Sequence, residues 1–288
     1  MNFMKPLPFI EINPRLCARC GACVRDCLAG ILFFPERNSS DTDSVSSLPE
    51  FCEGGAERCF QCQHCLAVCP TGALSFAGKR PEDSFPIGKL PEPELVRNLL
   101  RQRRSIRDYR RENVSAEIMR ELRNVMNFVP TGCNDHRLRF TWSSDVKVTD
   151  SFRERVSSWL QERELTGTLP ASLARFAAFI PALKSGKDIF FRNAPHFVAI
   201  SVPPEAKDAH IDPFIAASQL EILASAFGLG TCWAGMATDL FNGSDELYEK
   251  LNIPDGFVLK IVLLFGIPAV HYARVPQPEP CAHQELET

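Results

Sequence analysis

Two short runs of four cysteines constrain this chain of 288 residues more than any other feature. The first run, CARCGACVRDC, extends from Cys17 to Cys27, with steps of three, three and four residues between its cysteines. The second run, CFQCQHCLAVC, extends from Cys59 to Cys69 and repeats the same steps. Thiols at this density are typical of a zinc site, of disulfides or of an iron–sulfur cluster.

The composition argues against disulfides. The hydrophobic content is 45% and the charged content is 23%, as in ordinary soluble globular proteins. Prolines and Glu11 interrupt the stretch MNFMKPLPFIEINP, which is therefore unlike a signal peptide. Lys260 lies within the apolar stretch FVLKIVLLFGIPAV, which is too short to span a bilayer. We therefore predict a soluble cytoplasmic protein with no membrane partner, whose thiols stay reduced. The net charge of -3 gives no field that would favour nucleic acid.

The spacing of the cysteines favours iron–sulfur clusters over zinc, whose structural sites usually take two close pairs of ligands well apart in sequence. C-x2-C-x2-C-x3-C is the run of bacterial ferredoxins, in which the fourth cysteine binds the other cluster. Pro70 follows the second run, as in that pattern, whereas Leu28 follows the first, and Cys52 is interpreted as an unligated thiol. The predicted ligands are Cys17, Cys20, Cys23 and Cys69 for one [4Fe–4S] cluster and Cys59, Cys62, Cys65 and Cys27 for the other.

The uneven distribution of cysteines predicts two domains. Nine of the twelve cysteines lie before residue 70, and residues 77–94 contain four prolines and two glycines, which is typical of a linker. We place a two-cluster ferredoxin-type domain at residues 1–85 and a second domain at residues 86–288. The polar, serine-rich residues 35–50 are predicted to form an exposed loop.

The second domain is predicted to mix helices and strands. Asp212 is expected to cap a helix with Pro213 at its first position, and this helix is apolar nearly all round, as in a core or a subunit interface. The elements interleave without regular βαβ units, so we predict the α+β class. Helices are predicted in residues 95–105, 115–129 (with Ser115 as cap), 150–164 and 212–230, and strands in residues 138–143, 196–202 and 257–268.

Three separated segments carry candidate binding residues. RRSIRDYR, from Arg103 to Arg110, is densely cationic, and arginine forks suit phosphate and carbonyl oxygens, although a solvated basic patch is the alternative. PTGCN, from Pro130 to Asn134, is either a binding turn or a plain turn after a helix. GLGTCWAGM, residues 228–236, has glycines that permit close backbone approach, or that simply end a helix.

Together these segments and the FGIPAVHYARVP tail resemble the nitroreductase family of FMN enzymes over roughly residues 91–278. The resemblance implies a nitroreductase-like fold and a homodimer with FMN sites built by both subunits, in which the chemistry occurs at FMN and no side chain is catalytic. The sequence departs from the family at His136, Arg137 and Leu138, where many members have Gln, Pro and Trp, and at Tyr272, where many have Lys or Arg. The implied FMN-binding residues are Arg103, Arg104, Ser105, Arg107, Thr131, Asn134, Ala234, Gly235, Met236 and Arg274.

The two signatures predict an iron–sulfur flavoprotein oxidoreductase. Electrons from a redox donor would cross two [4Fe–4S] clusters to FMN, which would reduce a small-molecule acceptor such as a nitro, quinone or related conjugated compound. The redox donor would be ferredoxin or NAD(P)H. Two alternatives remain: NAD(P)H could reduce FMN directly while the clusters pass electrons outward, or the chain could be a non-catalytic redox or electron-transfer module. Residues 168–191 would shape the acceptor pocket, either as a mobile lid or as helices that cover the dimer, but the sequence does not position them.

Overall fold

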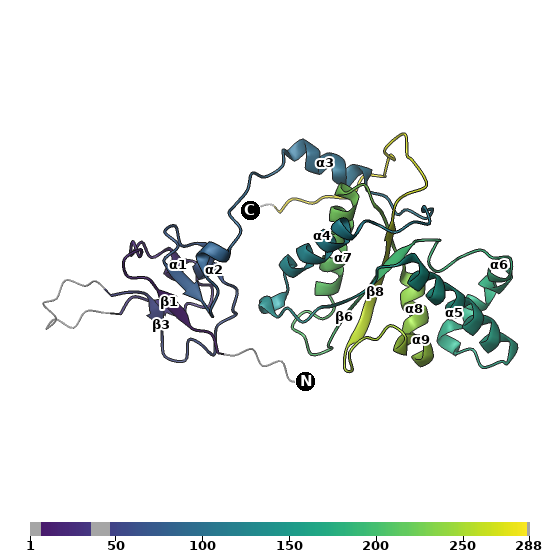
Figure 1. The fold of residues 1–288 in the computed structure, drawn as a ribbon, viewed down its shortest axis with the longest axis horizontal. Coiled ribbons are helices and arrows are strands. Elements are labelled where there is room, and N and C mark those ends of the chain that lie inside the picture. The colour runs from purple at the N-terminus through teal and green to yellow at the C-terminus, as the bar shows by residue number, and fades with distance from the viewer. Residues whose placement is uncertain (1–6, 36–46, 287–288) are drawn as a thin grey trace, which may run out of the picture. The chain divides into compact units, whose positions relative to one another are not determined.

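The computed structural model describes residues 7–35 and 47–286 and divides the chain into two compact units (Figure 1). The first unit is Met1–Leu90 with Cys133–Asp135, and the second is Pro91–Gly132 with His136–Thr288. Most of the loop predicted at residues 35–50 lies outside the described residues. No helix in the part of the chain that the structure describes is both long and apolar enough to cross a membrane.

The first unit is built from two similar halves, each with a short helix after its second cysteine. Each helix starts from a left-handed residue, Gly21 (φ 71°) or Gln63 (φ 62°), which turns the chain sharply between closely spaced cysteines. β1 pairs with β4 and β2 pairs with β3, both antiparallel, around a small apolar core. The elements are β1 (Ile10–Ile12), α1 (Ala22–Arg25), β2 (Leu32–Phe33), β3 (Glu50–Phe51), α2 (His64–Ala67), β4 (Leu74–Phe76) and the 3-10 turn η1 (Pro81–Asp83).

The second unit is organised around an antiparallel sheet with the strand order β5-β6-β8-β7. Successive residues of β6, such as Phe197 and Val198, enter two different core clusters on opposite faces of the sheet. Because both faces are covered, the central strands are apolar without alternation, as the sequence indicated. The strands are β5 (Arg139–Ser143), β6 (His196–Val202), β7 (Gly230–Trp233) and β8 (Val258–Gly266).

Helices cover both faces of this sheet, in agreement with the predicted α+β class (Figure 1). α4 (Ala116–Val125) and α7 (Asp212–Ala226) pack on one face, and α3 (Pro93–Gln102) contacts α7. The other face is covered by α5 (Val146–Leu165), η4 (Ala171–Phe179), α6 (Ile180–Lys184), α8 (Gly235–Asn242) and α9 (Asp245–Glu249). Two further 3-10 turns are η2 (Met126–Phe128) and η3 (Gly132–Asn134).

Most predicted elements agree with the structure, but the cap of α7 was wrong. Ser115 caps α4 as predicted, since its Oγ accepts a hydrogen bond from the Ile118 N–H at 3.3 Å. The N-cap of α7 is instead Ile211, and Asp212 is already helical. The buried carboxylate of Asp212 accepts from the Gly132 N–H at 3.1 and 3.3 Å, so a distant backbone donor holds it.

Residues 168–191 form η4, α6 and the segment that leads to β6. η4 and α6 both contact α5, and Leu173, Phe176 and Ile180 are buried in the core cluster on that face of the sheet. This segment is therefore a structural layer of the second unit.

Candidate functional site

Two of the candidate segments of the second unit lie side by side. Ser105 forms a parallel bridge with Thr231 of β7, and the Ile106 N–H donates to the Thr231 carbonyl at 2.7 Å. Gly230 permits this approach, because a Cβ added there would lie 2.5 Å from Ile106 Cγ1. RRSIRDYR and GLGTCWAGM, far apart in sequence, are thus parts of one site.

A buried carboxylate fixes one arginine of this site. Arg103 Nη1 lies 3.3 Å from Glu221 Oε1, and the Thr231 hydroxyl donates to the same oxygen at 3.1 Å. Glu221 is only 5% exposed, so its charge needs these partners. This pair holds the Arg103 guanidinium beside the end of β7.

Two further guanidinium groups act on the neighbouring Cys232. Burial raises the pKa of the Cys232 thiol, and the positive charges of Arg107 and Arg192 oppose that rise. Arg192 has a left-handed backbone (φ 53°) in a loop that Asp188 holds, since the Phe191 N–H donates to its carboxylate at 2.9 Å. We call Arg103, Arg107 and Arg192 the arginine cluster.

The backbone after β7 supplies donors of another kind. Ala234 is the N-cap of α8, and its own N–H donates to the Val262 carbonyl at 2.8 Å. The next N–H groups, of Gly235 and Met236, start the helix, where backbone donors lack intrahelical partners and the helix dipole is positive. No heavy atom lies within 4 Å of a Cβ built on the exposed Gly235, so the space beside it is open. Arginine forks, free N–H donors and open space fit the phosphate and the ring of a flavin.

The remaining predicted FMN contacts are not brought together with the arginine cluster. Thr131 Oγ1 accepts from the His136 N–H at 3.0 Å, and Asn134, with a left-handed backbone, groups with the first unit. Arg104 and Arg274 are exposed, and no hydrogen bond among the described residues ties them to the cluster.

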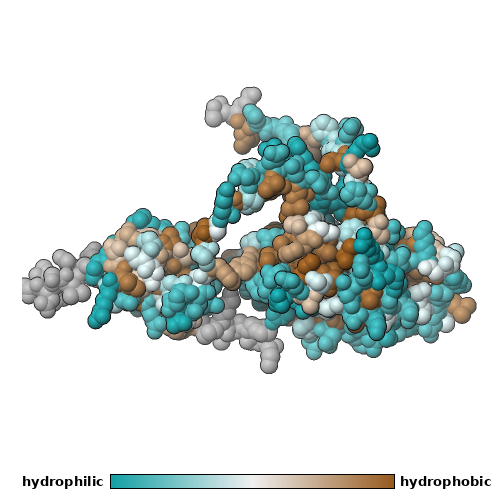
Figure 2. Space-filling model, turned by 45° about the horizontal axis from the view of Figure 1, so that its top comes forward, coloured by the Kyte–Doolittle hydropathy of each residue, from teal (hydrophilic) through white to brown (hydrophobic). Residues whose placement is uncertain are grey.

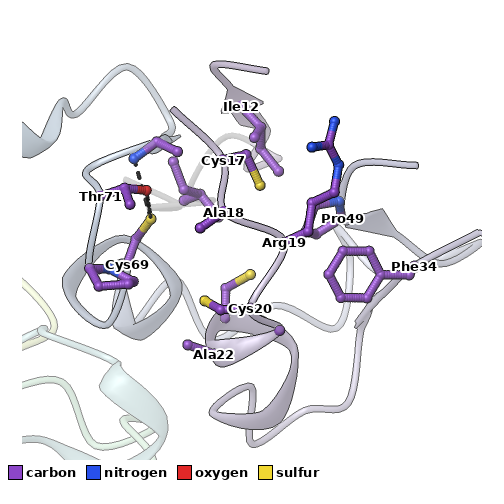
Figure 3. Close-up of a pocket in the computed structure, with 15 residues that line it drawn as sticks. Ile12, Cys17, Ala18, Arg19, Cys20, Ala22, Phe34, Pro49, Cys69 and Thr71 are labelled. Atoms are coloured by element: carbon purple, nitrogen blue, oxygen red, sulfur yellow. Dashed lines mark hydrogen bonds between the residues drawn. The ribbon is translucent and has the colours of Figure 1, made fainter. Parts of the chain in front are cut away.

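The eight predicted thiol ligands line two pockets of the first unit. We call the pocket of Cys17, Cys20, Cys23 and Cys69 site 1 and that of Cys27, Cys59, Cys62 and Cys65 site 2. Each pocket thus takes three cysteines of one run and the last cysteine of the other (Figure 3 shows part of site 1). The empty volumes are similar, about 350 Å³ at site 1 and about 380 Å³ at site 2. Four thiols around an apolar pocket are the donor set of a [4Fe–4S] cluster.

The individual thiols that line the two sites differ in acidity. Burial raises the pKa of Cys65 to about 12, and burial together with neighbouring thiols also raises the pKa values of Cys23 and Cys59. Cys69 differs: burial acts to raise its pKa, but hydrogen bonds from the Ala73 N–H and from Thr71 outweigh burial and lower it. Cluster binding must therefore displace protons from Cys23, Cys59 and Cys65.

Comparison with known proteins identifies both parts of the chain. Residues 100–267 match the nitroreductase family, and residues 16–73 match the 4Fe-4S dicluster domain. The chain belongs to the nitroreductase family. The comparison with curated proteins finds no match.

Solved nitroreductases share the fold of the second unit. One with bound FMN from Bacteroides fragilis NCTC 9343 is 17% identical, with a TM-score of 0.51 over 66% of this chain and 98% of that chain. A second nitroreductase with bound FMN, from Desulfitobacterium hafniense DCB-2, is 16% identical, with a TM-score of 0.52 over 66% of this chain and 98% of that chain. An FMN-dependent nitroreductase from Clostridium difficile R20291 is 19% identical, with a TM-score of 0.50 over 67% of this chain and 100% of that chain. At these identities the likeness shows the fold.

These findings confirm the predicted family and fold. Membership of the nitroreductase family supports an FMN-dependent oxidoreductase, and the dicluster match indicates two [4Fe–4S] clusters in the first unit. The sequence predicted the arginines of RRSIRDYR but missed Glu221 and Arg192. Glu221 had a visible signal, because it is a charged residue within the apolar stretch IAASQLEILASAF of this nitroreductase. Arg192 had none, because only the fold of its loop brings it to Cys232.

Proposed function

We propose that this protein is an iron–sulfur flavoprotein oxidoreductase. Electrons pass one at a time through two [4Fe–4S] clusters to FMN, which reduces a nitro, quinone or related conjugated compound. When bound, the clusters carry single electrons and FMN carries one or two. The observation that most supports this proposal is the presence of two pockets of four thiols and an arginine cluster in one chain.

We assign the arginine cluster and Ser105 to the FMN phosphate. Arg103 is preoriented by Glu221, so less side-chain entropy is lost when it binds an anion. The bridge between Ser105 and Thr231 fixes the backbone that carries Arg107. Ala234, Gly235 and Met236 would lie at the ring, where helix N-terminal donors favour negative charge. The roles of Arg104, Thr131, Asn134 and Arg274 remain predictions.

We assign a homodimer on the basis of exposed apolar side chains. Leu95 and Leu100 of α3 are 63% and 54% exposed, and Phe214 of α7 is 41% exposed. Figure 2 shows hydrophobic residues gathered in the middle of the visible face of the second unit, with hydrophilic residues around them. Subunit interfaces bury surfaces of this kind. A cytoplasmic location, where thiols stay reduced, suits the two sets of cluster ligands.

Anaerobic preparation with counts of iron, sulfide and flavin tests the proposal. We expect about eight iron atoms and one FMN per chain if two four-iron clusters form. Zinc in place of iron would contradict the assignment of the first unit.

The direction of electron flow needs a second measurement. Reduction of FMN by a reduced ferredoxin should slow in Cys20→Ala, whereas Cys281→Ala, at an exposed thiol outside both sites, should behave as wild type. Equal FMN reduction in both variants would contradict this path. If NADH reduces FMN faster than ferredoxin does, the clusters pass electrons outward. A lack of turnover with every nitro and quinone acceptor would favour a non-catalytic module.

A further inference from the structure

The repeat in the first unit allows its two cluster sites to be compared position by position. The second run follows the first at a distance of 59 − 17 = 42 residues, so Ala29 corresponds to Thr71 and Cys27 to Cys69. Cys69 is a ligand of site 1 and Cys27 of site 2. The residues two positions after these equivalent ligands thus differ, because Thr71 carries a hydroxyl group and Ala29 does not.

At site 1 this hydroxyl contacts the ligand sulfur. Thr71 Oγ1 lies 3.7 Å from Cys69 Sγ, and the Ala73 N–H donates to the same sulfur at 3.2 Å (Figure 3). A cysteine bound to iron has lost its proton, so the Thr71 hydroxyl must be the donor in the loaded site. At site 2 the methyl group of Ala29 cannot donate.

The linings of the two pockets are similar in polarity, because Arg19 and Thr71 line site 1 and Gln63 and His64 line site 2. The Arg19 guanidinium points away from the sulfur atoms in Figure 3 and is exposed. Its charge is therefore screened by water and contributes little. The hydrogen bonds to the ligand sulfur atoms, rather than the lining or a buried charge, distinguish the two sites. Cys69 Sγ has two such bonds at site 1, whereas at site 2 Cys59 Sγ accepts one, from the Gln61 N–H at 3.4 Å.

Reduction adds one electron, and so one negative charge, to a cluster without making or breaking a bond. Donors to the sulfur atoms stabilise that extra charge. We propose that site 1 is reduced before site 2, and that the Thr71 hydroxyl helps to set the difference between them. The inference rests on the proposed binding of two clusters and deepens it.

An anaerobic dithionite titration of the full chain, followed by electron paramagnetic resonance, tests the order of reduction. Wild type should show two separate reduction steps. The ligand variants Cys20→Ser and Cys62→Ser assign the steps, because each alters the signal of one site. The step altered by Cys20→Ser should be the one at higher potential.

The role of the Thr71 hydroxyl is tested by exchanging the equivalent residues Thr71 and Ala29 of the two repeats. In Thr71→Ala the ratio of reduced site 1 to reduced site 2 should fall roughly fivefold, as for one ordinary hydrogen bond. Ala29→Thr should lower the same ratio by stabilising reduced site 2, and Thr71→Ser, which keeps the hydroxyl, should match wild type.

The outcomes separate this inference from the proposed function. Preparations without about eight iron atoms per chain would contradict the clusters themselves. Two full clusters that are reduced together, or in the reverse order, would overturn the order of reduction. If Thr71→Ala left the ratio unchanged, the role of the hydroxyl would be wrong.

Discussion

The two units of this protein build their sites in opposite ways. In the first unit each cluster site takes three ligands from a run of seven residues, around a buried core of Leu32, Cys65, Leu66, Leu74 and Phe76. In the second unit two large core clusters hold the sheet, and Arg103 of the arginine cluster is held by Glu221, which lies 118 positions away in the chain. We therefore expect the first unit to depend on its cofactors for structure, and the second to form its site from a fold that is stable without them.

Removal of iron is expected to produce the largest difference in stability between the two units. Anaerobic chelation should unfold the first unit, because its apolar core is small and its pockets would lose the atoms that join both runs. The second unit should keep its fold. Limited proteolysis should then cut first within residues 7–76 and leave the nitroreductase part intact. Equal protection of both parts after complete iron loss would contradict this dependence.

Gly230→Val is expected to have the largest effect within the second unit. The new side chain would overlap Ile106, whose atoms come within 2.5 to 2.9 Å of the added Cβ, and would push RRSIRDYR away from β7. We expect a loss of about 3 kcal/mol in the free energy of unfolding, together with weak FMN binding.

Gly235→Ala is the matched control for this clash. Nothing lies within 4 Å of the added Cβ there, so the free energy of unfolding, measured by urea titration, should change little. Equal losses in both variants would show that close approach at Gly230 is not the cause.

Glu221→Ala should destabilise the second unit by about 2 kcal/mol. It leaves the Thr231 hydroxyl buried and the Arg103 guanidinium without its carboxylate, and the cost is moderated because the Arg103 side chain is 34% exposed. Glu246→Ala removes an exposed partner of Arg163 and should cost less than about 0.5 kcal/mol. A urea titration that found similar losses would contradict the buried role of Glu221.

The same contrast explains what the sequence could predict. The cluster ligands follow from spacing within short runs, and the apolar stretch HFVAISV predicts β6 with its bounds, His196–Val202. The partners of Asp212 and Arg103 lie 80 and 118 positions away in the chain. Local sequence patterns do not indicate which distant residues form such pairs. A charged residue in an apolar helix, such as Glu221, shows only that a partner must exist.

The smallest expected effect is a dependence on pH that belongs to the second unit. His196 is fully buried, Nε2 accepts from the Val114 N–H at 3.0 Å, and Nδ1 lies 3.1 Å from the Ser143 carbonyl, so Nδ1 carries the proton. Burial lowers the pKa of His196 below its ordinary value of 6.5, despite the opposing effects of Ser143 and Asp145.

The unfolded chain therefore binds a proton below about pH 6.5 that the folded chain does not, and stability should fall as the pH decreases. The largest slope that one group can give is about 1.4 kcal/mol per pH unit. Urea titrations of wild type and His196→Gln at pH 7.5 and 5.5 should differ in this slope. His210→Gln, at an exposed histidine, should keep the wild-type slope. If His196→Gln also kept the wild-type slope, protonation of another group would account for the loss of stability. The contrast between the two units would then depend on the effect of iron chelation alone.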